Sequence, residues 1–176
     1  MNFVVKTLSV LLSVIALNVV LPIEAQLFGG TSVVLGKKHY YIETSNQGSF
    51  YEAAYSCAQL GMTLASIESK TEFNSLKSFL TNSEIIANVY WLSGISYGPL
   101  NTAKPYSWLG TGKPITYWSS DPELTNADQC LKTVTNTFEY AEGTCTESNY
   151  YICEKPLEPY CGKYGQCRYT YSSNSN

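Results

Sequence analysis

Six cysteines behind an apolar N-terminal segment constrain this 176-residue chain more than any other feature. Lys6 precedes a short apolar run between residues 7 and 21, and Ala25 is a small residue after which cleavage is expected. The run is shorter than the roughly 20 apolar residues of a membrane-spanning helix. The pattern therefore predicts a signal peptide over residues 1–25 and a secreted, extracellular protein with no membrane span. In that compartment an even number of cysteines favours a disulfide framework over a metal or redox site.

Charge and residue content exclude several classes of function. The formal net charge is −3 and the chain has no basic run, which argues against nucleic acid or an anionic membrane as partner. Its one histidine, His39, falls in a predicted edge strand, and no serine or cysteine nucleophile has a plausible base. We therefore expect a protein that is not an enzyme. The 15 tyrosines fit either packing in strands or a stacking surface for sugars.

Local patterns predict two helices after a first strand over residues 37–43. Ser49 and Glu52 are spaced as a capping box, and Gly61 ends the helix that they begin. Ser69 and Glu72 form a second box. Apolar residues at helical spacing predict the buried faces: Phe50, Ala53, Ala54, Cys57 and Leu60 in the first helix, and Phe73, Leu76 and Leu80 in the second.

Short strands and long connections follow from Val89 onward. Residues 131–135 and 150–154 are the clearest strands there, and the loop over residues 110–126 is long enough to suggest a functional role. The predicted organisation has a short lead over residues 26–35, one domain over 36–156 and a tail over 157–176 that carries Cys161 and Cys167.

Four aromatic motifs surround the cysteines of the domain: Tyr90-Trp91-Leu92-Ser93-Gly94, Trp108-Leu109-Gly110, Tyr117-Trp118-Ser119-Ser120-Asp121-Pro122-Glu123 and Tyr150-Tyr151-Ile152-Cys153-Glu154. In this order the chain resembles the C-type lectin-like family, from roughly Gly36 to Lys155. The resemblance implies an α+β fold with two helices, antiparallel strands, a long loop and stabilising disulfides. It also implies that Trp91, Trp108 and Trp118 are core residues, although Trp118 and Tyr117 would otherwise suit a sugar-stacking platform.

Sequence alone allows 15 connectivities for six cysteines. The resemblance selects Cys57–Cys153 and Cys130–Cys145, and it leaves Cys161 and Cys167 to pair with each other. The last pair departs from the usual plan of the family, so an intermolecular bond through either cysteine is an alternative.

The resemblance also implies a site for calcium and carbohydrate. In sugar-binding members the metal lies between two motifs that correspond here to Asp121-Pro122-Glu123, with a cis bond before the proline, and Tyr140-Ala141-Glu142. A further family acid corresponds to Asp128. Calcium takes six to eight oxygen ligands, so the predicted metal and carbohydrate ligands are the carboxylates of Asp121, Glu123, Asp128 and Glu142.

Two departures from the motif weaken the predicted sugar contact. Ala141 offers no side-chain oxygen, and Glu123 replaces an amide with an acid. A carboxylate accepts hydrogen bonds but cannot donate one, so a sugar hydroxyl loses a partner. We expect a secreted recognition protein for an extracellular glycan or glycoprotein, with weakened calcium dependence. The alternatives are a calcium-independent protein-binding module, or a component of an extracellular assembly that binds through the loop or the tail.

Overall fold

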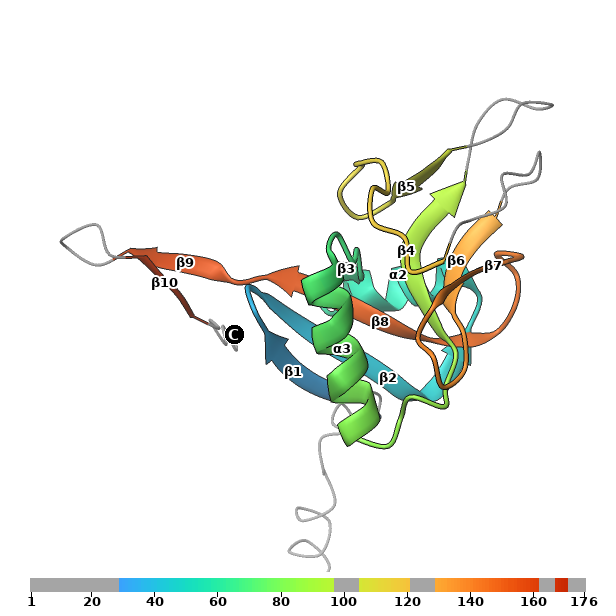
Figure 1. Cartoon of the computed structure of the whole chain (residues 1–176), viewed down its shortest axis with the longest axis horizontal. Helices are drawn as coiled ribbons and strands as arrows, with labels where there is room; N and C mark the ends of the chain where they lie inside the picture. Colours follow the sequence, from blue (N-terminus) through green and yellow to red (C-terminus); the bar gives the residue numbers. More distant parts are fainter. Residues whose placement is uncertain (1–28, 97–104, 121–128, 162–166, 171–176) are drawn as a thin grey trace, which may run out of the picture.

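A computed structural model describes residues 29–96, 105–120, 129–161 and 167–170. The predicted signal peptide lies outside these ranges. Most of the described strands form one mixed sheet in the order β1-β2-β8-β4-β6-β7, with β3 beside β8 and β5 beside β4 (Figure 1). The strands of this sheet are β1 (Thr31–Leu35), β2 (Lys38–Gly48), β3 (Thr63–Leu64), β4 (Tyr90–Ser96), β5 (Tyr106–Trp108), β6 (Gln129–Thr133), β7 (Tyr140–Gly143) and β8 (Asn149–Pro156).

The N-terminal part of the sheet differs from the sequence prediction. Residues 31–35, expected to belong to a short lead, form β1 and pair antiparallel with β2. The prediction that His39 lies in an edge strand is wrong, because β2 runs between β1 and β8 and His39 is paired with Val34 on one side and Lys155 on the other. One central pairing, between β4 and β8, is parallel, whereas the other pairings of the sheet are antiparallel.

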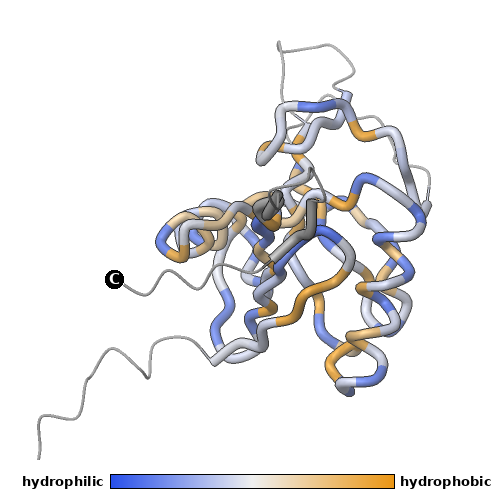
Figure 2. Tube along the Cα trace, turned by 90° about the vertical axis from the view of Figure 1, so that its left-hand side faces the viewer, coloured by the Kyte–Doolittle hydropathy of each residue, from blue (hydrophilic) through white to orange (hydrophobic). Residues whose placement is uncertain are grey.

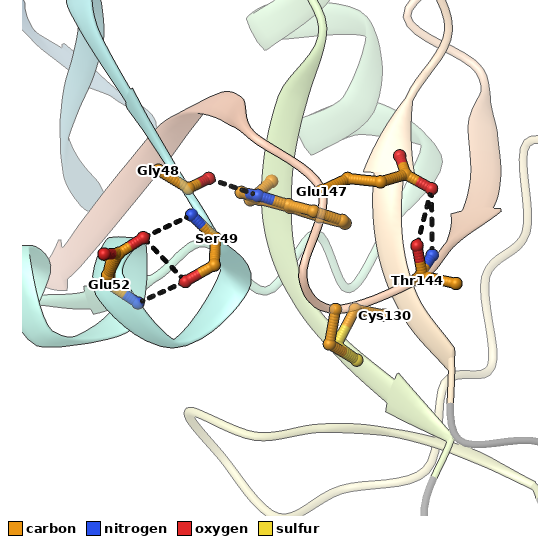
Figure 3. The surroundings of a disulfide bond; sticks show 8 residues. Gly48, Ser49, Glu52, Cys130, Thr144 and Glu147 are labelled. Carbon is orange, nitrogen blue, oxygen red and sulfur yellow. Dashed lines mark hydrogen bonds between the residues drawn. A yellow bond between two sulfur atoms is a disulfide. The ribbon is translucent and has the colours of Figure 1, made fainter.

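Helix α2 (Phe50–Gln59) has the predicted boundaries. The Ser49 hydroxyl accepts a hydrogen bond from the Glu52 amide, and the Glu52 carboxylate accepts one from the Ser49 amide (Figure 3). Gly61, just beyond the helix, has a φ of +65°, a conformation that glycine adopts without strain. The capping box and the glycine therefore begin and end this helix as expected.

Helix α3 (Lys70–Asn82) has only half of its predicted capping box. The Ser69 hydroxyl accepts from the Glu72 amide, as expected. The Glu72 carboxylate, however, accepts from the Glu68 amide, the Tyr40 hydroxyl and the Lys38 ammonium. The Glu72 carboxylate thus binds a lysine and a tyrosine that are distant in sequence, and the Glu68 amide, instead of the Ser69 amide that a capping box requires.

The two helices pack on opposite faces of the sheet. Tyr40 and Ile42 of β2 belong to a core cluster with the buried face of α3, whereas Tyr41, between them, belongs to a second cluster with α2. Successive residues of a strand point to opposite faces, so this alternation defines the two layers. The residues predicted to be buried on α3 are in the first cluster: Phe73, Leu76 and Leu80. Trp91 and Trp108 are core residues, as predicted.

Two disulfides brace the described domain, and the first links helix α2 to the sheet. Cys57 of α2 is bonded to Cys153 of β8. Cys130 of β6 is bonded to Cys145, between β7 and β8, and Figure 3 shows the bond at Cys130. Both bonds are those that the resemblance implies. Strands β9 (Glu158–Cys161) and β10 (Cys167–Thr170) form a separate two-stranded sheet that extends away from the main sheet, with Cys161 opposite Cys167 (Figure 1). A Cys161–Cys167 bond stays a prediction, since those side chains are outside the described part.

Candidate ligand-binding site

The candidate site lies at the end of the sheet formed by β6 and β7. Of the four predicted ligands, the structure places only Glu142, which is on β7 opposite Leu131 of β6. Asp121, Glu123 and Asp128 lie outside the described residues, and so does Pro122 with its predicted cis bond. The structure therefore describes only Glu142 of this predicted site, together with the two chain segments that flank residues 121–128.

The Glu142 carboxylate has an unsatisfied oxygen. Its Oε1 atom is buried and has no hydrogen-bond partner among the described residues, and the buried hydroxyl of Tyr106 on β5 also has none. Burial raises the pKa of Tyr106, and the Glu142 carboxylate raises it further through its charge and through hydrogen bonding. The Tyr106 hydroxyl is therefore a donor close to Glu142, although the contact falls short of standard hydrogen-bond geometry. A buried polar atom without a partner costs about 1–3 kcal/mol. This oxygen is therefore a place where a cation or a hydrogen-bond donor would stabilise the protein.

The segment immediately before residues 121–128 is attached to β7. The Ser119 hydroxyl accepts a hydrogen bond from the Tyr140 amide at 2.7 Å, and the Ser120 hydroxyl donates one to the Tyr140 carbonyl at 2.6 Å. Strand β6 follows residues 121–128 and pairs with β7 from Cys130 onward. Both described ends of the 121–128 segment are thus held against the strand that carries Glu142.

Aromatic side chains support this end of the sheet from the core side. Trp118 contacts the rings of Tyr106 and Tyr140 in edge-on geometry, with ring centroids 5.3 Å and 6.2 Å apart. Tyr117 contacts Phe73 and Tyr140. Both Tyr117 and Trp118 are partly buried against the first core cluster. Trp118 therefore packs against the core but, unlike Trp91 and Trp108, is only partly buried, so its predicted core role holds in part.

A second charged group lies on the other face of β7. Ala141, half-buried, is opposite Lys132, and the Lys132 ammonium pairs with the Glu147 carboxylate. Glu147 also accepts from the amide and hydroxyl of Thr144, at 3.0 Å and 3.1 Å (Figure 3). The hydrogen bond from Lys132 lowers the pKa of Glu147. Residues adjacent in a strand face opposite sides, so this cation is paired on the face away from Glu142.

Sequence reasoning missed this Lys132–Glu147 pair. The Thr144-x-x-Glu147 spacing is a local signal for the bonds from Thr144 to Glu147. No comparable signal connects Lys132 to Glu147, because their contact depends on the pairing of β6 with β7.

The described residues fit a calcium site only in part. Glu142 supplies a carboxylate oxygen in need of a partner, whereas Ala141 supplies none. Within the described ranges no group of three or more His, Cys, Asp or Glu side chains is placed to hold a metal. A complete set of ligands therefore requires the acids of residues 121–128. The described helices also include none that is long and apolar enough to cross a membrane.

The domain has one helix on each face of a mixed sheet and contains the Cys57–Cys153 and Cys130–Cys145 disulfides. This is the architecture of a C-type lectin-like domain. Residues 46–155 match the Lectin C-type domain family, and the chain belongs to that family.

Curated relatives share moderate identity with the chain. Human early activation antigen CD69 is 31% identical over 122 residues, which cover 69% of this chain and 53% of CD69. Lymphocyte antigen 75 of Mesocricetus auratus is 30% identical over 114 residues, which cover 62% of this chain and 6% of the antigen. The chain thus spans about half the length of the first relative and a small part of the second. C-type lectin 37Db of Drosophila melanogaster is 28% identical over 139 residues, which cover 76% of this chain and 89% of that lectin.

Solved structures share the fold. The carbohydrate-recognition domain of mouse scavenger receptor C-type lectin superposes with a TM-score of 0.58 at 22% identity, covering 72% of this chain and 94% of that domain. A calcium-independent type II antifreeze protein superposes with a TM-score of 0.57 at 25% identity, covering 71% and 91%. SPL-1 in complex with GlcNAc superposes with a TM-score of 0.59 at 17% identity, covering 74% and 96%. Two of these three identities are below 25%, so those likenesses concern the fold alone.

Proposed function

We propose that this protein is a secreted, non-catalytic recognition module that binds an extracellular glycan or glycoprotein at the β6–β7 end of its sheet. The observation that carries the proposal is the buried, unpartnered Oε1 atom of Glu142. Hydrogen bonds to Tyr140 and the β6–β7 pairing hold both ends of the 121–128 segment against the same strand. Membership of the Lectin C-type domain family and the apolar N-terminal segment support the same function.

Calcium is the proposed partner of Glu142. Asp121, Glu123 and Asp128 are the acids of the adjoining segment, and together with Glu142 they would hold the ion. When bound, calcium would accept a lone pair from a ligand hydroxyl, and the carboxylates would accept the proton of that hydroxyl. Because Ala141 and Glu123 supply no amide donor, the ligand keeps one lone pair without a partner. We therefore expect weaker sugar binding than a site with two amides would give.

Calorimetric titration of the mature protein with calcium tests this proposal. Glu142→Gln removes the charge of the buried ligand and is expected to weaken calcium binding at least about tenfold, because ligand charge tunes calcium affinity. Glu139→Gln is the matched control, since Glu139 is an exposed acid three residues away and is expected to leave binding unchanged. No heat at millimolar calcium, or equal effects of the two substitutions, would contradict a calcium site at Glu142.

Calcium-independent recognition of a protein is the second candidate function. The absence of a side-chain oxygen at Ala141 favours it, and one structural neighbour is a calcium-independent antifreeze protein. A glycan array probed with and without a chelator separates the two candidates. Glycan binding that the chelator abolishes supports the first candidate. Absence of glycan binding with and without the chelator, together with binding to extracellular proteins in a separate assay that the chelator leaves unchanged, supports the second.

A further inference from the structure

An open groove of about 570 Å³, here called the α3 groove, is lined by helix α3 and the end of strand β1. Leu35 of β1 and Phe79 of α3 line it with apolar surface, and both are partly buried against the core. The other lining residues belong to α3 and carry hydroxyl or carboxamide groups: Thr71, Asn74, Ser75, Ser78 and Asn82. The volume is within the roughly 300–1,000 Å³ of ligand pockets. The groove thus combines apolar and hydrogen-bonding surface and has no charged lining residue.

Three of the polar side chains form a row along α3. Asn74, Ser78 and Asn82 are four residues apart, so they share one face of the helix, and all three are exposed. At a rise of 1.5 Å per residue the row is about 12 Å long. In the described part of the chain these three side chains make no hydrogen bond, whereas the Ser75 hydroxyl donates to the Thr71 carbonyl at 2.9 Å. The row therefore has free donors and acceptors for a ligand.

The row is also unfavourable for the helix that carries it. Asn74 and Ser78 are inside α3, and Asn and Ser have lower helix propensity than Ala or Gln because their side chains compete for backbone hydrogen bonds. The exposed face of α2, in contrast, includes Ala58 and Gln59. Figure 2 shows hydrophilic and hydrophobic stretches alternating along α3, the helix at the right of the view. Residues that break a local rule without a structural gain are expected at functional sites.

We propose that the α3 groove is a second, metal-independent binding site, and that its ligand is a neutral oligosaccharide. A carboxamide donates and accepts hydrogen bonds at the same time, so Asn74 and Asn82 can each bond to sugar hydroxyls, which also do both. Ser78 lies between them and adds a hydroxyl. Leu35 and Phe79 supply apolar surface for the C–H face of a sugar ring. A ligand with an anionic group is disfavoured, because it would lose hydration without meeting a lining cation.

The α3 groove provides the amide donors that the β6–β7 site lacks, since Ala141 and Glu123 supply none there. The choice of an extracellular glycan as ligand rests on the proposed function, but the two sites share no residue. Strands β1 and β7 are at opposite ends of the sheet order. Calcium and Glu142 therefore control binding at one site, and the polar row of α3 controls it at the other.

A glycan array probed with the mature protein in EDTA tests the α3 groove, because the chelator removes calcium from the β6–β7 site. The array carries neutral oligomers of mannose, galactose and N-acetylglucosamine beside sialylated and sulfated glycans. We expect neutral oligomers to bind in EDTA, and calorimetry then measures the affinity of the one with the strongest signal. Amide chemical shifts of residues 71–82 should change when that oligomer is added.

The double variant Asn74→Ala/Ser78→Ala removes two polar groups of the row and should weaken binding in EDTA at least about tenfold, because both hydrogen bonds to the sugar are lost. Both substitutions raise helix propensity, so urea unfolding should show unchanged or higher stability. Loss of binding is then separated from loss of the fold. Thr81→Ala is the matched control, since Thr81 is an exposed residue of α3 outside the groove lining. It should keep the affinity.

Binding of neutral glycans in EDTA that is lost in the double variant, and kept in Thr81→Ala and Glu142→Gln, supports the α3 groove. Any glycan binding left in the double variant should then require calcium. Complete loss of glycan binding in EDTA would overturn the groove and leave the calcium site standing. Binding in EDTA to anionic glycans only, or neutral-glycan binding unaffected by the double variant, would also overturn it. Absence of glycan binding with and without calcium would overturn both sites.

Discussion

Lys38 is the centre of a largely buried charge cluster that joins β2, α3 and β8. Its ammonium lies 2.7 Å from a Glu72 oxygen and 2.9 Å from a Glu154 oxygen, and it donates to the Ser66 carbonyl at 2.7 Å. The side chains of Lys38 and Glu154 are 18% and 4% exposed. The positive charge of Lys38 therefore stabilises the Glu154 carboxylate, which is almost inaccessible to solvent.

Replacing Lys38 with methionine keeps the apolar stem but leaves both carboxylates without their cation. Removal of one partner from a buried ion pair costs about 3–5 kcal/mol, because the remaining carboxylate must either stay charged without its cation or take up a proton. This is a large part of the 5–15 kcal/mol that is typical of a domain, as a rough range. Lys113→Met is the internal comparison. Lys113 pairs with Glu68 at 3.0 Å, but the two side chains are 66% and 33% exposed, and such pairs contribute about 1 kcal/mol or less.

Urea unfolding of the mature protein at pH 7.5, with the disulfides intact, measures both losses of unfolding free energy. We expect the loss in Lys38→Met to be at least about three times the loss in Lys113→Met. In the double variant Lys38→Met/Glu154→Gln, part of the stability should return, since the second change removes the buried charge. Equal losses in the two single variants, or no recovery in the double variant, would refute the argument that burial determines the cost.

Two further predictions concern pH and the disulfides. Burial raises the pKa of Glu154 to about 7 from 4.5, and Lys38 offsets this only in part. The native state thus binds this proton more tightly than the unfolded chain, so the contribution of Glu154 to stability is fully present below pH 4.5 and is lost as pH rises through about 7. Thermal unfolding at pH 5 and 7.5 should show a smaller loss of stability with rising pH in Glu154→Gln than in the unsubstituted protein, because the substitution removes this contribution. Cys57–Cys153 and Cys130–Cys145 span 96 and 15 residues, so removing the first pair by alanine substitution should cost about 1.6 kcal/mol more in urea unfolding than removing the second. Equal costs would contradict the chain-entropy explanation.

Local sequence patterns determined the helices of this protein. Ser49, Glu52 and Gly61 act on backbone groups within a few residues of themselves, so their spacing predicts where α2 begins and ends. The buried faces followed from helical periodicity for the same reason. Cysteine spacing alone could not predict the two disulfides of the described domain, because 15 connectivities are compatible with six cysteines. It could not identify the family either. The disulfides followed from the resemblance to the C-type lectin-like family, which rests on the order of the aromatic motifs around the cysteines.

Tertiary structure decided the features that depend on residues distant in sequence. The Glu72 carboxylate accepts hydrogen bonds from Lys38 and Tyr40 instead of completing the predicted capping box, because β2 brings their ammonium and hydroxyl groups next to it. His39 became internal because β1 pairs with β2.

At the candidate site, the sequence motif pointed to Glu142. Only the packing of β7 beside Tyr106 left its oxygen buried without a partner. Hydrogen-bond satisfaction of a buried group depends on every element packed around it, and a sequence pattern reports only the neighbours along the chain.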